Sequence, residues 1–176
     1  MALSSDARRA LIWVSADFGM LTARASLDAL NAPSNGTRWT NRELLFHMWF
    51  GQRIARVFVP LMGGFSRLPQ PVSRLNAQLL TAMSRPYEWV NYAGSVAGAR
   101  VGGLTRAQRW MVNDTAAILR WADAASDEDL ARGMAVPAGW DPYFAPWMSR
   151  RDLLEWAPKH YRHHRAQLTL PEPEAA

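Results

Sequence analysis

Apolar residues recur along this sequence with the period of an α-helix. From about residue 6 to 30, apolar side chains alternate at steps of four and three, which is the spacing of one helix face packed in a bundle. Helices are also expected near 40–59, 105–125 and 150–168. Because no apolar–polar alternation is long enough to build a sheet, we predict an all-α fold, a four-helix bundle. The first helix face is formed by Ala7, Leu11, Val14, Phe18, Leu21 and Ala25.

Residues that satisfy free backbone groups mark where the helices begin. Thr40, followed three residues later by Glu43, has the pattern of a capping box. Ser149 and Asp152 repeat this pattern before the last helix. Thr105 is the expected cap of the third helix. These three positions predict the starts of the second, fourth and third helices.

A long connection separates the second helix from the third. The second helix is expected to stop before Pro60, because proline inside a helix removes a backbone hydrogen bond. Residues 59–103 are interrupted by Pro and Gly, with short helices expected near 74–84 and 86–99. Such a crossover allows two consecutive long helices to run in the same direction. The predicted order of the bundle is therefore up-down-down-up.

The length and hydropathy of the chain indicate one globular unit. With 176 residues, we expect a single domain over 1–170 and a disordered tail over 171–176. No stretch approaches the roughly 18 apolar residues that a membrane span needs. Asp6 and Asp17 interrupt the N-terminal apolar segment and argue against a cleaved signal peptide. We therefore expect a cytoplasmic protein with no membrane partner.

Composition removes several classes of chemistry. The chain has no cysteine, which excludes disulfides, thiolate metal ligands and a cysteine nucleophile. Its 20 Lys and Arg residues are scattered, so no nucleic-acid partner is expected. Arg100, Arg106 and Arg109 could meet carboxylates of a substrate, or face solvent like the other arginines. Small molecules are the expected partners.

The four histidines are unevenly distributed along the chain. His160, His163 and His164 lie close together in the last helix, and His47 lies more than a hundred residues upstream, in the second. His160 and His164 are four residues apart on the inward face of the last helix, a spacing that can place two ring nitrogens on one metal ion. His47 lies on the inward face of the second helix. Each alone could be an ordinary core histidine, but burying unpaired imidazoles costs about 1–3 kcal/mol each.

The three inward histidines can meet only if the second and fourth helices are antiparallel. At about 1.5 Å per residue, His47 lies roughly 10 Å from the start of its helix, while His160 and His164 lie roughly 12 and 6 Å from the end of theirs. Antiparallel packing places all three at one level. We therefore predict a metal site of His47, His160 and His164 with an open coordination position, as in catalytic sites, for zinc or nickel.

Other residues near this site have two interpretations. Glu43 could orient the ring of His47, although capping is its main expected role. His163 lies off the inward face, beside Arg162, and is expected near the surface rather than as a ligand. Aromatic residues of the linker before the last helix could wall a substrate pocket or simply cover the bundle. They are Trp140, Tyr143, Phe144 and Trp147.

Two motifs resemble a known family. The segments WTNRELLFHMWF, with His47, and HYRHHRAQL, with His160 and His164, are similar to those of the DinB/YfiT-like superfamily of bacterial four-helix bundles. The resemblance covers nearly the whole chain, including the position of the crossover. It implies that a divalent metal, commonly zinc or nickel, binds to these three histidines.

The resemblance also implies a reaction class. Characterised members of the family include thiol transferases that use bacillithiol, mycothiol or glutathione, and a mycothiol-dependent maleylpyruvate isomerase. The Arg-rich composition indicates a high-GC bacterium, which favours mycothiol as the thiol partner. The expected function is metal-dependent transfer of a small thiol to an electrophile, and a homodimer is expected. Metal-dependent hydrolysis of a small amide or ester, and a stress-related metal-binding role without turnover, are the alternatives.

Overall fold

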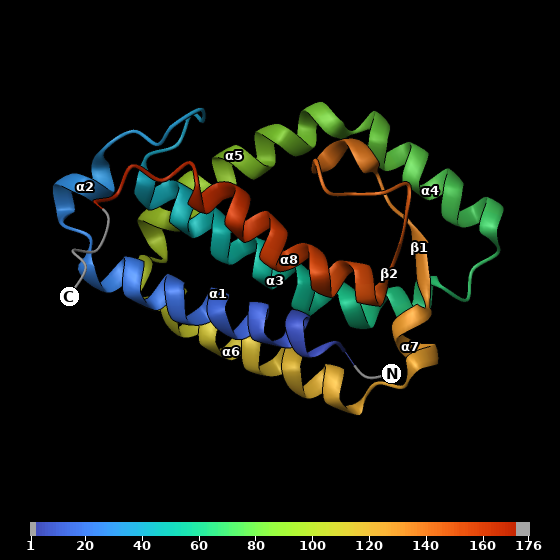
Figure 1. The fold of residues 1–176 in the computed structure, drawn as a ribbon. Helices are drawn as coiled ribbons and strands as arrows, with labels where there is room; N and C mark the ends of the chain where they lie inside the picture. The colour runs from blue at the N-terminus through green and yellow to red at the C-terminus, as the bar shows by residue number, and fades with distance from the viewer. Residues whose placement is uncertain (1–2, 172–176) are drawn as a thin grey trace.

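The computed structural model describes residues 3–171, which form eight α-helices, one 3-10 turn and two short strands (Figure 1). The expectation of a predominantly helical protein is confirmed. The predicted tail lies outside the described residues except for Pro171. The elements are α1 Ser5–Arg24, α2 Leu27–Asn31, α3 Asn41–Phe65, α4 Gln70–Ala82, α5 Ser84–Val101, α6 Leu104–Ala124, α7 Asp127–Ala131, β1 Gly133–Ala135, η1 Ala138–Trp140, β2 Trp147–Ser149 and α8 Arg150–Arg165.

Both predicted capping boxes are present. The Thr40 backbone N–H donates to Glu43 Oε2 at 3.0 Å, and the Glu43 N–H donates to Thr40 Oγ1 at 3.4 Å. Ser149 and Asp152 make the same reciprocal pair at the start of α8. The prediction for α6 was wrong by two residues, because Gly103, with φ of 69°, precedes the helix and Thr105 lies in its first turn. Capping residues therefore located two of the three starts.

The first predicted helix is two helices. The expected helix over about 6–30 is broken at Ala25, whose backbone is extended (φ −69°, ψ 125°). Ser26 then caps α2 by accepting a hydrogen bond from the Ala29 N–H at 3.1 Å. The physical reason is that a serine hydroxyl satisfies a free N–H better at a helix start than inside a helix. The break lets Leu30 enter the core.

The second predicted helix does not stop before Pro60. Helix α3 runs through this proline to Phe65. Val59 and Met62, on either side, are both 2% exposed, so their burial compensates for the lost backbone hydrogen bond. Arg150 Nη2 of α8 also donates to the Pro60 carbonyl at 3.2 Å. Tertiary contacts outweigh the local preference of proline here.

Helices α4 and α5 connect α3 to α6. They are longer than the predicted 74–84 and 86–99 and are separated only by Met83. In Figure 1 the two green helices arch over one side of α3 and α8. The loop between the two strands lies between these crossover helices and α8 (Figure 1).

Helices α3 and α8 lie side by side in opposite directions (Figure 1). Near the start of α3, Asn41 Nδ2 donates to Thr169 Oγ1, just beyond the end of α8, at 2.8 Å. Near the end of α3, Pro60 meets Arg150, the first residue of α8. The early turns of α3 therefore face the late turns of α8, which is the condition for the predicted meeting of histidines.

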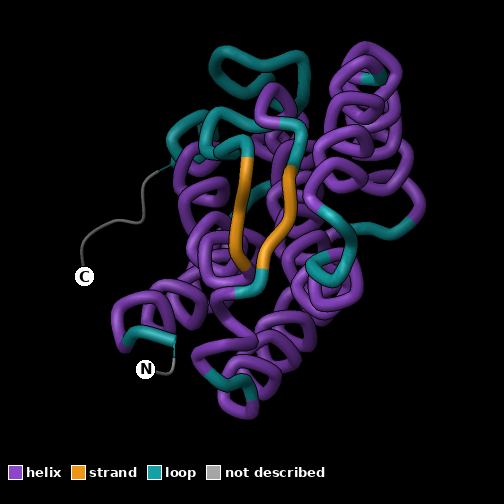
Figure 2. The backbone as a smooth tube through the Cα atoms, turned by 90° about the vertical axis from the view of Figure 1, so that its right-hand side faces the viewer, coloured by secondary structure: helices purple, strands orange, loops and turns teal. Residues whose placement is uncertain are grey.

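Two three-residue strands hold the loop before α8, and the sequence pattern did not predict them. Strands β1 and β2 are antiparallel, with Met134 paired to Met148 (Figure 2). Gly133 permits the close approach, because a Cβ there would collide with the Met148 carbonyl. Three residues are too few for a recognisable alternation. The strands close the ends of the segment 136–146 and return it to the helices.

The core lies between α1, α3, α6 and α8. Met111 and Ile118 of α6 are buried, while Trp110 and Trp121 are half-buried. Asp114, fully buried, accepts from Trp49 Nε1 at 3.1 Å and forms ion pairs with two arginines of α3. Within residues 3–171, no helix has both the length and the apolarity to cross a bilayer.

Candidate metal centre

The structure brings His47, His160 and His164 together. One ligand atom from each ring lies within 4.8 Å of the others. The ring centroids are 5.1 Å apart for His47 and His160, 4.7 Å for His47 and His164, and 4.6 Å for His160 and His164. His47 belongs to α3 and the other two to α8. The cluster thus joins two helices that are far apart in sequence.

Hydrogen bonds occupy the Nδ1 atom of every ring in the cluster. His160 Nδ1 lies 2.8 Å from Asp141 Oδ2, His164 Nδ1 lies 2.7 Å from Gln167 Oε1, and His47 Nδ1 lies 3.4 Å from Ser95 Oγ. A carboxylate and an amide oxygen can only accept, so His160 and His164 must donate from Nδ1. Their Nε2 atoms then carry free lone pairs. This is how outer residues prepare imidazoles for a metal.

His160 Nε2 is a buried polar atom with no hydrogen-bond partner among the described residues. Leaving such an atom unpaired costs about 1–3 kcal/mol, so it calls for an explanation. A metal ion would supply the partner. The orphaned nitrogen therefore fits the metal predicted from the sequence.

Burial keeps two of the rings neutral. Desolvation, and then the neighbouring His160 and His164, hold the pKa of His47 well below its ordinary value, although Asn91 opposes them. Desolvation, followed by the charge of His160, lowers the pKa of His164 to about 3. A neutral imidazole is the form that coordinates a metal. His47 and His164 can therefore bind a metal without first losing a proton at neutral pH.

Aromatic side chains surround the cluster. Trp39 stacks on His47 with ring centroids 4.5 Å apart, and Trp156 lies against His160 at 4.8 Å. His47 and His160 are only 5% and 7% exposed. Both tryptophans also line a cavity beside the histidines.

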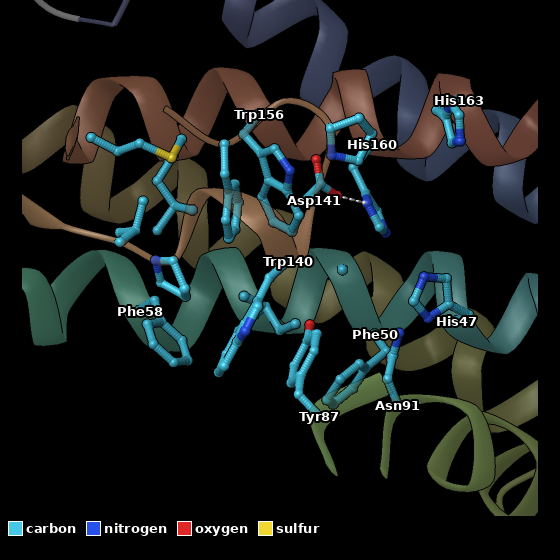
Figure 3. Close-up of a pocket in the computed structure, with 18 of the residues that line it drawn as sticks. His47, Phe50, Phe58, Tyr87, Asn91, Trp140, Asp141, Trp156, His160 and His163 are labelled. Atoms are coloured by element: carbon cyan, nitrogen blue, oxygen red, sulfur yellow. Dashed lines mark hydrogen bonds and ion pairs between the residues drawn. The ribbon is translucent and has the colours of Figure 1, made fainter. Parts of the chain in front are cut away.

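Asp141 is the residue of the site that the sequence analysis missed. It lies in the loop between β1 and β2, and Figure 3 shows its carboxylate directed at His160. Burial opposes its ionisation, but hydrogen bonds from His160 and the Tyr143 backbone bring its pKa below the ordinary value. The feature of the sequence that could have identified Asp141 is a single carboxylate within an aromatic, Pro-rich loop.

Some predicted roles have a clear outcome. Glu43 makes the capping box at the start of α3, which is the role favoured from the sequence. His163 is half-buried at the rim, with its ring 5.0 Å from His164, and is not one of the three clustered histidines. Trp140 and Phe144 line the cavity, whereas Tyr143 and Trp147 are 43% and 52% exposed.

A cavity of about 460 Å³ opens onto the histidines (Figure 3). It lies between α3, α8, the crossover helices and the strand-bounded loop. A volume of this size is within the usual range for small-molecule sites. Arg100, Arg106 and Arg109 are exposed and do not line it. Their exposure agrees with the interpretation that they face solvent.

Helix α8 is also fixed from its other side. Tyr161, next to His160, donates from its hydroxyl to Asp17 Oδ2 of α1 at 2.8 Å. Arg165 Nε donates to the same oxygen at 2.8 Å. These two contacts fix the rotation of α8 about its axis. The two histidines consequently face α3 and the cavity.

Of three comparisons with known proteins, one found a match. Neither the curated proteins nor the solved structures include a significant match to this chain. The model of the DinB superfamily matches residues 10–168, which include all three clustered histidines. The chain therefore belongs to the DinB superfamily.

Proposed function

We propose that the protein binds a divalent metal through His47, His160 and His164 and is a thiol transferase for a mycothiol-like thiol and a small electrophile. The observation that carries the metal site is the convergence of three imidazoles with every Nδ1 engaged and the buried His160 Nε2 unpaired. The reaction class comes from membership of the family.

Zinc and nickel are the metals that we propose, because both suit imidazole ligands. The bound metal would supply Lewis acidity that lowers the pKa of a thiol at the open position. The chain itself holds the ligand rings: Asp141 orients His160, and Gln167 orients His164. With no cysteine in the sequence, the thiol must come from a substrate.

We infer that α1, α3, α6 and α8 form the predicted up-down-down-up bundle, in a single domain over 1–170. The antiparallel contact of α3 with α8, and the contacts of α1 with α6 and α8, support this order. The long connection through α4 and α5 is also consistent with it. The homodimer stays a prediction, which the molecular mass in solution would test.

Hydrolysis of a small amide or ester is a second candidate, and one observation favours it. His163 lines the cavity beside His164 and could act as a general base. Asp141 is unsuited to that role, because its carboxylate is engaged by His160. A metal-binding, stress-related protein without turnover is the third candidate.

Elemental analysis tests the metal site directly. Protein purified without added chelator should contain close to one zinc or nickel ion per chain. His47→Ala and His160→Ala should each remove it, whereas His163→Ala should retain it. Unchanged metal content in the first two variants would refute the site.

A conjugation assay separates the three functions. With mycothiol and monochlorobimane, the thiol sulfur should form a C–S bond as the C–Cl bond breaks, releasing chloride and the thiol proton. Fluorescence of the conjugate measures this step. Ester hydrolysis without thiol consumption would favour the hydrolase, and no turnover of either kind would favour the metal-binding protein.

A further inference from the structure

The cavity beside the histidines is unusual for its lack of positive charge. The chain has 20 Lys and Arg residues, yet none of them is among the described residues that line this cavity. Its one acidic group, Asp141, is already paired with His160. Away from the histidine end, the walls are apolar or aromatic. They include Ile54, Phe58, Leu80, Met134, Val136 and Leu153.

Aromatic rings form opposite walls of the cavity. Tyr87 and Trp140 stack on each other at 3.8 Å with an interplanar angle of 8°, and Figure 3 places them across the cavity from Trp156. Trp140 Nε1 donates to Ser84 Oγ at 3.2 Å, so its polar atom is already satisfied. Trp140 therefore offers its ring to a ligand rather than a hydrogen bond. Flat apolar molecules gain most from such walls.

A charged ligand would be poorly accommodated here. A carboxylate, phosphate or sulfonate in the body of the cavity would lose water and find no cationic side chain to replace it. Burying an unpaired charge is far more costly than burying an apolar group. The nearest negative group, Asp141, would add repulsion. The cavity thus discriminates by charge as well as by size.

We propose that this cavity binds an uncharged aromatic molecule, with its reactive end at the histidines. The claim that this molecule is the electrophile rests on the proposed function. The claim that the cavity binds such a molecule depends only on the cavity walls. The proposal excludes dicarboxylates as the substrate. A cavity of about 460 Å³ is suited to a molecule with two or three fused or linked rings.

Two probes with the same ring framework test the proposal. N-phenyl-1-naphthylamine is uncharged, and 8-anilinonaphthalene-1-sulfonate adds one sulfonate. Fluorescence titration of metal-free protein should give one binding site for the uncharged probe, with a dissociation constant at least tenfold lower than for the sulfonate. Equal affinities, tighter binding of the sulfonate, or no binding of the uncharged probe would overturn the proposal.

Substitutions at two neighbouring leucines of α4 test where the probe binds. Leu80 lines the cavity, whereas Leu79 is 60% exposed and lies outside it. Leu80→Arg should weaken binding of the uncharged probe at least tenfold and strengthen that of the sulfonate. Leu79→Arg should change neither. Equal effects of the two variants would place the probe on the exposed surface and overturn the proposal.

If the Leu80→Arg variant does not fold, a second pair of substitutions on α3 makes the same test. Phe58 lines the cavity and is 48% exposed, so it tolerates a charge; Val57 is 42% exposed and does not line it. Phe58→Arg should weaken binding of the uncharged probe, and Val57→Arg should not. These titrations use metal-free protein, so the two proposals can fail separately. If the protein binds the probe but no metal, only the proposed function is refuted. If it binds metal but not the probe, only this inference is refuted.

Discussion

Gly51 of α3 leaves the space that the imidazole of His160 occupies. A methyl group built on Gly51 would lie 2.5 Å from His160 Cδ2 and 2.8 Å from His160 Nε2. Both distances are below normal van der Waals contact. The glycine therefore allows a ring of α8 to lie directly against the backbone of α3, which brings it within reach of His47.

Gly51→Ala should displace His160 and weaken metal binding at least tenfold, while the helix content stays unchanged. Competition with a chromophoric chelator measures the affinity, and circular dichroism measures the helix. Gly64→Ala in the same helix is the matched control, because nothing lies within 4 Å of the added methyl group. Equal affinities in the two variants would contradict the steric argument.

Asp141→Asn should lower the metal affinity by about 10–100-fold, the usual loss when a residue that orients a metal ligand is changed. The amide has a weaker acceptor for His160 Nδ1 and carries no charge to favour the bound ion. The same chelator competition measures it. Glu128→Asn, at an exposed position on α7, should have no effect, and a similar loss there would argue against orientation by Asp141.

Removing the metal should destabilise the native protein, because the three-histidine site exists only when α3 and α8 are packed. At a free metal concentration 100 times the dissociation constant, binding adds about 2.7 kcal/mol. For a chain of this size, that corresponds to roughly 5–10 °C in Tm. Calorimetry with and without chelator should show this shift in the wild type and none in His47→Ala; a shift of equal size in the variant would exclude this site as its origin.

Asp114→Ala should reduce the free energy of unfolding by about 1–3 kcal/mol, because it leaves the buried Trp49 N–H without its acceptor and two arginines without their partner. Both arginines reach solvent, which limits the loss. Asp123→Ala removes an exposed carboxylate of the same helix and should cost less than about 1 kcal/mol. Urea denaturation compares the two, and a larger loss at Asp123 would contradict this ranking.

Local patterns in the sequence predicted both the helical character of the protein and the three histidines of the candidate site. Both depend on local patterns: the periodicity of apolar residues, the capping boxes at Thr40 and Ser149, and the spacing of four between His160 and His164. Each of these is encoded within a few turns of one helix. The antiparallel relation of α3 and α8 could be inferred only because a single arrangement brought His47 to the same level.

The surroundings of those histidines depend on contacts between distant segments of the chain. Asp141 reaches His160 because two short strands return its loop to the helices, and no periodicity in the sequence encodes that contact. Helix α3 continues past Pro60 because its neighbours are buried and Arg150 meets the proline carbonyl. The cavity without cationic side chains likewise arises where four separate segments meet. Local patterns specify elements, whereas contacts between distant segments depend on how those elements pack.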